Sequence, residues 1–156
     1  MRLSLVELGF LTLAAVVVAT TLPRCGPGRT VVRARWDWTP GVLNPAVSQA
    51  TIASTICRRG WTRTIRPPVD YTNALKQQQL RRYGLRGPPS AYQEDHLISL
   101  ELGGNPADPR NLWPEPYSRA TAVDRIENDL NHRVCNGSLT LAEAQRRESA
   151  LKHRNG

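Results

Sequence analysis

The residues best suited to chemistry lie close together in the middle of the chain. An acidic residue and a histidine are neighbours at Asp95 and His96, a glycine pair follows at Gly103 and Gly104, and Asn111 opens the segment Asn-Leu-Trp-Pro-Glu-Pro. An imidazole titrates near neutral pH, so it can take up or release a proton during a reaction. Adjacent residues of a strand point to opposite faces. Asp95 and His96 can therefore serve one site only where the strand bends or a metal ion lies at its edge.

This ordered set resembles the HNH endonucleases, the ββα-metal nucleases. That family carries an Asp-His or His-His pair on a first strand, a loop that often contains two glycines, an Asn-Leu pair, and a helix with the last metal ligand. The resemblance covers about residues 92–135, and residues 55–145 also look like small secreted actinobacterial proteins described only as HNH-like. It implies an α+β fold with a small ββα-metal core and flanking helices.

The resemblance also implies roles for particular residues. His96 would be the general base, Asn111 would brace the loop or the histidine, and Asp95 stands at the first metal-ligand position. Many family members have a histidine on the helix, but this chain has none in register. Asp124 falls where that ligand could lie, and Glu127 is one turn further. Carboxylate ligands suit Mg²⁺ or Mn²⁺ better than Zn²⁺, which is the less favoured alternative, and the ion would stabilise the leaving oxygen.

Charge and length suggest a small domain with a polyanionic partner. The chain has 156 residues, a formal net charge of +8 and an isoelectric point near 10.2. Such a balance favours nucleic acid, acidic wall polymers or anionic membranes as partners. Residues 61–69 are predicted to be extended, and four arginines in and just before this segment form a basic stripe: Arg58, Arg59, Arg63 and Arg66. The stripe either binds phosphate groups or is the solvent-exposed face of a strand.

The first part of the chain suggests export. Residues 1–21 read as a signal peptide, with an apolar run over residues 8–18 that is short for a membrane-spanning helix, which needs about 20 apolar residues. An uncleaved membrane tether is the alternative. Residues 22–44 are predicted to be a flexible basic linker, and residues 45–156 the domain. In an oxidising compartment Cys57 and Cys135 should form a disulfide, which leaves Cys25 without an assigned partner.

Helices are predicted on both sides of the central motif. Thr72 can cap a helix over about residues 73–83, with Gly84 after its end. A second helix should cover about residues 119–133, with Val123, Ile126, Leu130 and Val134 as its buried stripe. The sequence Thr-Leu-Ala-Glu at 140–143 is a capping box that opens a last helix to about residue 152.

The function expected from these features is an exported, metal-dependent endonuclease. It would hydrolyse phosphodiester bonds in DNA, with RNA as the alternative substrate, at low sequence specificity and without a small-molecule cofactor. The rival is a non-catalytic extracytoplasmic protein that binds nucleic acid or acidic wall polymer on a decayed HNH scaffold. His96 and Asn111 favour the enzyme, whereas the missing helix histidine favours the rival. The pattern does not predict an oligomeric state.

Overall fold

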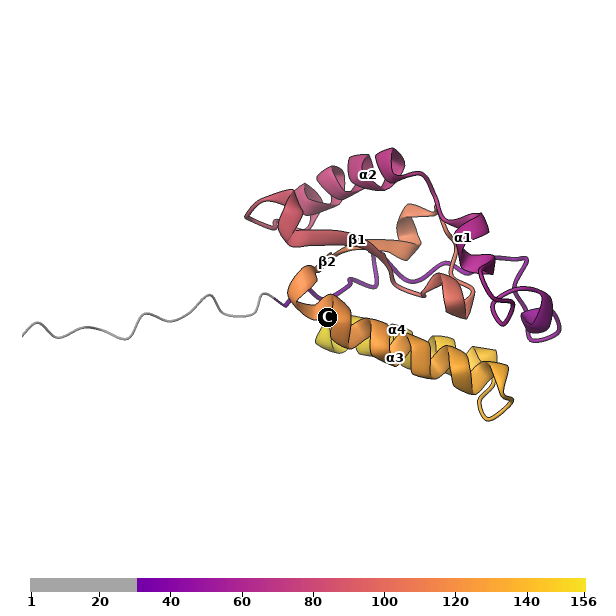
Figure 1. The fold of residues 1–156 in the computed structure, drawn as a ribbon. Helices are drawn as coiled ribbons and strands as arrows, with labels where there is room; N and C mark the ends of the chain where they lie inside the picture. The colour runs from indigo at the N-terminus through magenta and orange to yellow at the C-terminus, as the bar shows by residue number, and fades with distance from the viewer. Residues whose placement is uncertain (1–30) are drawn as a thin grey trace, which may run out of the picture.

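The computed structural model describes residues 31–156, and this part of the chain is an α+β fold (Figure 1). Its sheet has two antiparallel strands, β1 (Tyr92–His96) and β2 (Leu112–Pro116). Tyr92 pairs with Pro116 and His96 pairs with Leu112, so the loop between the strands begins directly after the histidine. The predicted signal peptide and Cys25 lie outside the described residues. Within residues 31–156, no helix is long and apolar enough to cross a membrane.

Four α-helices accompany the sheet in the described part of the chain: α1 (Trp61–Ile65), α2 (Val69–Arg82), α3 (Tyr117–Cys135) and α4 (Leu141–Asn155). Helix α2 lies on one side of the hairpin, and α3 and α4 run side by side on the other (Figure 1). Helix α3 starts at the residue after β2 ends. The hairpin is therefore enclosed between helices, and the end of β1 faces the α3–α4 pair.

Local sequence signals explain most helix ends. Helix α2 starts earlier than predicted, directly after Pro68, and Gly84 adopts a φ of +64° beyond its end, as a helix-ending glycine does. Helix α4 is capped as predicted, because the Thr140 hydroxyl accepts a hydrogen bond from the Glu143 backbone N–H at 3.3 Å. In α3 the buried stripe is Ala120, Val123, Glu127, Leu130 and Val134, while Ile126 is 40% exposed. The prediction of Ile126 as a core residue is therefore wrong, and Glu127 lies in the buried stripe.

Two predictions for the first part of the domain do not match the structure. Residues 61–69 are not extended, because Trp61–Ile65 forms α1 and the Thr64 hydroxyl donates to the Trp61 carbonyl at 2.7 Å. This hydrogen bond from the side chain to the backbone lies within the helical turn, although threonine generally prefers strands. Part of the predicted linker, residues 31–44, packs on the domain: Val32 and Ala34 are buried, and Leu43 bridges to Gly104.

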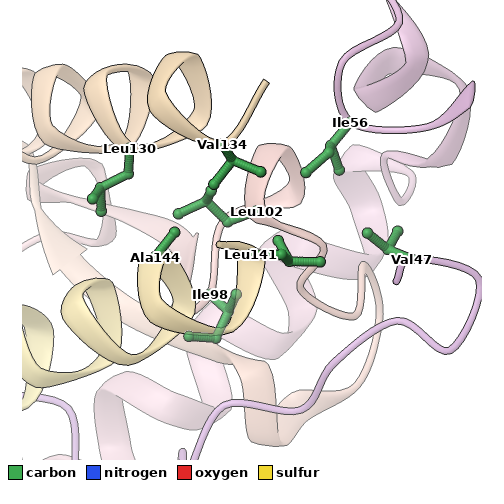
Figure 2. Packing of buried hydrophobic residues seen from close by; sticks show 8 residues of the cluster. All are labelled: Val47, Ile56, Ile98, Leu102, Leu130, Val134, Leu141 and Ala144. Carbon is green, nitrogen blue, oxygen red and sulfur yellow. The ribbon is translucent and has the colours of Figure 1, made fainter. Parts of the chain in front are cut away.

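Two apolar clusters hold these layers together. The larger one joins α3, α4 and the loop after β1 through eight residues drawn in Figure 2: Val47, Ile56, Ile98, Leu102, Leu130, Val134, Leu141 and Ala144. The second includes Leu97 and Trp113, both fully buried, together with Val32 and Ala34 from the segment before the domain's first helix. The loop after His96 thus contributes to both clusters, which fixes the end of β1 on both sides.

The predicted disulfide between Cys57 and Cys135 is confirmed. It ties the segment before α1 to the last residue of α3 across a sequence separation of 78 residues. Closing so long a loop restricts the unfolded chain, which is the main route by which a disulfide stabilises a protein. A disulfide is consistent with an oxidising, extracellular location.

We expect the double variant Cys57→Ser/Cys135→Ser to lower the free energy of unfolding by roughly 3–5 kcal/mol, because the unfolded chain regains its loop entropy. Denaturant unfolding of the oxidised proteins measures this, with Cys25→Ser as the matched control. Equal stability of the double variant and the control would contradict the structural role of the bridge.

Candidate functional site

A polar cavity of about 310 Å³ opens at the end of β1. Strand β1, the short segment after it, helix α3 and the stretch around Arg66 all line this cavity. The predicted residues Asp95, His96, Asp124 and Glu127 are among its lining residues. The structure therefore brings the strand and helix residues of the sequence motif to one place, although they are about thirty positions apart in the chain.

His96 reaches the cavity as a neutral imidazole with one nitrogen held. Its Nε2 lies 3.0 Å from the carbonyl oxygen of Pro106, and a carbonyl can only accept, so Nε2 carries the proton. Nδ1 then carries a lone pair and has no hydrogen-bond partner among the described residues. Burial lowers the pKa of His96 below its usual value, although the Pro106 carbonyl and Asp95 oppose the shift. The ring is thus a proton acceptor at neutral pH.

Asn111 positions the loop between the strands and does not face the cavity. Its side chain is fully buried and accepts a hydrogen bond from the Ile98 N–H at 3.0 Å. The same amide group donates to the carbonyls of Ile98 and Asn105 at 3.0 and 2.9 Å. All of these bonds stay within residues 98–111, the loop that also presents the Pro106 carbonyl to His96. Asn111 is therefore a positioning residue, as the sequence suggested.

The glycine pair is required by the same loop. At Gly104 an added Cβ would overlap the Ile98 carbonyl oxygen and come within 2.6 Å of the Asn111 amide nitrogen. At Gly103 the backbone has a φ of +78° and an added Cβ would lie 2.6 Å from a Val47 side-chain carbon. The Gly-Gly motif thus permits the close approach that lets the Asn111 side chain reach both of its carbonyl acceptors.

Two glutamates that the sequence motif did not single out also line the cavity. Both carboxylate oxygens of Glu94 are buried and have no hydrogen-bond partner among the described residues. Burial raises the pKa of Glu94 to about 8, with Lys76 opposing the shift. Glu101 is less buried, and burial followed by repulsion from Glu127 and Asp124 raises its pKa to about 7. At pH 7 Glu94 is therefore mostly uncharged, and Glu101 is about half uncharged.

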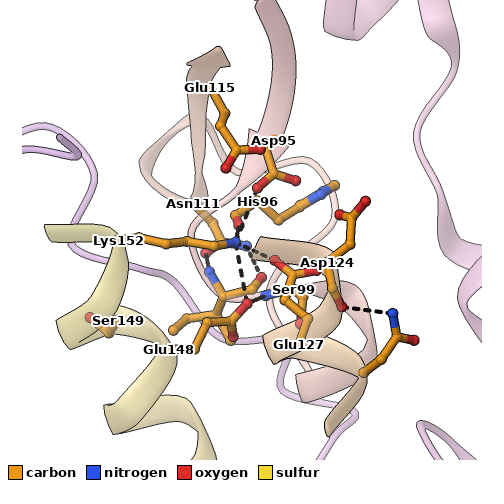
Figure 3. A network of polar contacts seen from close by, with 12 residues as sticks. Asp95, His96, Ser99, Asn111, Glu115, Asp124, Glu127, Glu148, Ser149 and Lys152 are labelled. Atoms are coloured by element: carbon orange, nitrogen blue, oxygen red, sulfur yellow. Dashed lines mark hydrogen bonds and ion pairs between the residues drawn. The ribbon is translucent and has the colours of Figure 1, made fainter. Parts of the chain in front are cut away.

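Beside the cavity, a lysine side chain lies at the centre of a buried polar cluster (Figure 3). The Lys152 ammonium of α4 is fully buried and lies 3.0 Å from Asp95, 2.5 Å from Glu127 and 3.3 Å from Glu148. It also donates to the backbone carbonyl of His96 at 2.5 Å. Burial alone would lower the pKa of Lys152, but the three carboxylates raise it well above its usual value. The ammonium stays charged.

The residues predicted to hold a metal ion do not fit that role together. A divalent ion between Asp95 and Glu127 would need the space that Lys152 Nζ fills, and it would lie against a like charge. Asp124 is exposed and forms no ion pair with Lys152; its carboxylate points to the cavity on the side of the His96 ring (Figure 3). Within residues 31–156, no group of three or more His, Cys, Asp or Glu side chains could hold a metal.

The four predicted arginines divide between two places. Arg66 lines the cavity next to His96, and it forms no ion pair with a described residue. Arg58, Arg59 and Arg63 line a separate shallow depression around α1 that contains no acidic residue. A phosphate group bound in the cavity would therefore meet one guanidinium, and the other three lie outside the cavity.

Sequence reasoning missed the most connected residues of the site. Lys152 and Glu148 are four residues apart on α4, a spacing that usually indicates an exposed helical pair, yet both are fully buried. Glu127 was predicted as a metal ligand but not as a buried residue; its burial could have been found from the spacing of Ala120, Val123, Glu127 and Leu130, which places a carboxylate inside a heptad-like apolar stripe. Glu94 and Glu101 gave no local signal, because their altered pKa values follow from tertiary burial.

We expect Gly104→Ala to cost roughly 3 kcal/mol or more of stability, because the methyl group must displace the backbone at Ile98 and the Asn111 amide. Thermal or denaturant unfolding measures the loss. Gly137→Ala is the matched control: its Cβ would meet open space, so only the positive φ of +81° is penalised, at about 1–2 kcal/mol. Similar losses for the two variants would contradict the tight packing described for the loop.

Stability should also fall with rising pH through Glu94. The pKa of this carboxyl is about 8 in the folded protein against 4.5 ordinarily, so the folded state keeps a proton that the unfolded chain has released. From about pH 4.5 to 8 the contribution decreases by at most about 1.4 kcal/mol per pH unit. Unfolding measured across this range should show a shallower decrease for Glu94→Gln, but not for the control Asp70→Asn, whose side chain is exposed and lies outside the cavity. Parallel curves for Glu94→Gln and wild type would rule out the shift.

Comparisons with known proteins do not assign a family or a function to this site. No protein-family model, curated protein or solved structure matches the chain. The cavity itself offers a neutral histidine with a free Nδ1, two glutamates whose pKa values are raised to about 8 and about 7, and one arginine without an ion-pair partner among the described residues.

Proposed function

We propose that this chain is an HNH-like nuclease that cleaves phosphodiester bonds in nucleic acid, with His96 as its general base. The observation that carries the proposal is the state of the His96 ring, whose Nε2–H is held by the Pro106 carbonyl while Nδ1 is left without a partner. The order β1, braced loop, β2 and α3 agrees with the ββα core that the sequence resemblance implies. Asn111 and the glycine pair support the base by fixing the loop that holds it.

The chain's own residues can supply the proton transfers of such a cleavage. His96 Nδ1 takes the proton of the attacking hydroxyl, from water on DNA or RNA or from the 2′-hydroxyl of RNA. The oxygen attacks phosphorus as the bond to the leaving oxygen breaks. The leaving oxygen then takes the proton of Glu101, whose pKa of about 7 keeps a useful share of this carboxyl protonated at neutral pH. Arg66 binds the phosphate oxygens during the step.

Electrostatics decides whether a phosphate can enter a cavity with so many acids. At pH 7 Glu94 is mostly neutral and Glu101 about half neutral, because burial raises their pKa values to about 8 and about 7. Asp95 and Glu127 are ion-paired to Lys152. Asp124 forms no ion pair with a described residue, and Arg66 lines the same cavity. The lining therefore carries less negative charge than its five acidic residues suggest, which favours the entry of an anionic substrate.

A second candidate, binding of a polyanion without catalysis, is favoured by one observation. The depression lined by Arg58, Arg59 and Arg63 is separate from the cavity and carries no acid, so it could hold nucleic acid or an acidic wall polymer whether or not His96 acts. Cleavage assays on labelled single-stranded RNA, single-stranded DNA and supercoiled plasmid, run beside gel-shift assays on the same molecules, separate the two. Tight binding with no cleavage of any substrate would favour the binding protein.

We expect His96→Ala to reduce cleavage by on the order of 10²–10⁴-fold, because the proton acceptor is lost. Initial rates on the substrate that wild type cleaves measure the effect, and melting curves check that the variant is folded. His132→Ala is the matched control, since His132 is exposed on α3 away from the cavity. If folded His96→Ala cleaves as fast as that control, His96 is not the base.

A further inference from the structure

The positive charge at the centre of the site comes from α4, a part of the chain that the sequence motif does not include. Lys152 Nζ lies 2.5 Å from Glu127, 3.0 Å from Asp95 and 3.3 Å from Glu148, and its side chain is fully buried. Ammonium-to-carboxylate distances of this size are those of charge-assisted hydrogen bonds. With the His96 carbonyl as a fourth oxygen, the ammonium is surrounded by oxygen atoms on several sides (Figure 3).

We propose that Lys152 is the resident cation of this site and that no divalent ion enters between Asp95 and Glu127. Oxygen ligands of this kind would otherwise suit a hard divalent cation. A Mg²⁺ ion binds its ligands at about 2.1 Å, so it cannot share the cluster with a nitrogen atom already at hydrogen-bond distance from both carboxylates. Expelling Lys152 would leave an ammonium without its partners next to an apolar core, which is strongly unfavourable.

The same lysine is a positioning residue for His96. Its ammonium donates to the backbone carbonyl of His96, the last residue of β1. Glu148, four residues earlier on α4, accepts from the Ser99 N–H at 2.9 Å, just beyond the histidine. Helix α4 therefore holds the chain at the last residue of β1 and again at Ser99, just after the strand ends. This part of the inference rests on the proposed role of His96, whereas the exclusion of a divalent ion does not.

Mn²⁺ binding, measured by electron paramagnetic resonance without nucleic acid, tests the proposal on wild type, Lys152→Met and Lys152→Met/Glu127→Gln. Wild type should bind no Mn²⁺ at Asp95, so wild type and Asp95→Asn should give the same Mn²⁺ titration. Lys152→Met leaves the carboxylates without a counter-charge, so it should bind Mn²⁺ at least tenfold more tightly than any residual binding by wild type. Its melting temperature should rise by several degrees when Mn²⁺ is added. The added Glu127→Gln change should remove that gain. Lys76→Met is the matched control, because Lys76 also donates to a β1 carbonyl, that of Tyr92, at 3.1 Å.

Mn²⁺ binding by wild type that is lost in Asp95→Asn overturns the proposal, as does a folded Lys152→Met with no more affinity for Mn²⁺ than the Lys76→Met control. If Lys152→Met folds neither with nor without Mn²⁺, the wild-type and Asp95→Asn titrations decide alone. None of these measurements requires cleavage, so a chain that cleaves nothing can still satisfy them. Conversely, cleavage that depends on His96 can be found even if the cluster proves to hold a metal.

Discussion

The ion-pair cluster around the Lys152 ammonium is the interaction on which the site depends. It joins Asp95 and the His96 carbonyl on β1 to Glu127 on α3, and Glu148 extends it to the Ser99 N–H. Every member is buried or nearly so, so removing one partner leaves an uncompensated charge in the interior, typically at a cost of about 3–5 kcal/mol. The cluster is therefore held together as a unit, and it fixes the distance between the hairpin and the α3–α4 pair.

That constraint explains why the cavity can be acidic in composition and still suit an anionic ligand. The single positive charge of Lys152 offsets part of the charge of Asp95 and Glu127 behind His96, while burial raises the pKa of Glu94 to about 8 and that of Glu101 to about 7. The imidazole is kept neutral by burial as well. Charge in this site is thus controlled mainly by desolvation and by one buried cation, and Arg66 is left as the lining group available to a phosphate.

The sequence predicted the parts of this arrangement that have local causes. Helix α3 was predicted from the spacing of its apolar residues and helix α4 from its capping box. The disulfide was predicted from the number of cysteines and the expected oxidising compartment. The family resemblance implied that Asn111 braces the loop or the histidine, and its hydrogen bonds in the structure all go to the loop at Ile98 and Asn105. The strand prediction for residues 61–69 failed because side-chain preference was outweighed by a local hydroxyl-to-carbonyl bond in α1. Lys152 could not be predicted, because its partners Asp95 and Glu127 lie 57 and 25 residues away and only folding brings them together.

The central claim is that an ammonium, and not a metal ion, lies between Asp95, Glu127 and Glu148. Anomalous diffraction from crystals soaked in Mn²⁺ tests it most directly, because the ion and the lysine side chain are seen in one map. The account predicts continuous density for Lys152 reaching the three carboxylates, with no anomalous peak between them. An anomalous peak bridging Asp95 and Glu127, with the Lys152 side chain turned away, would contradict it.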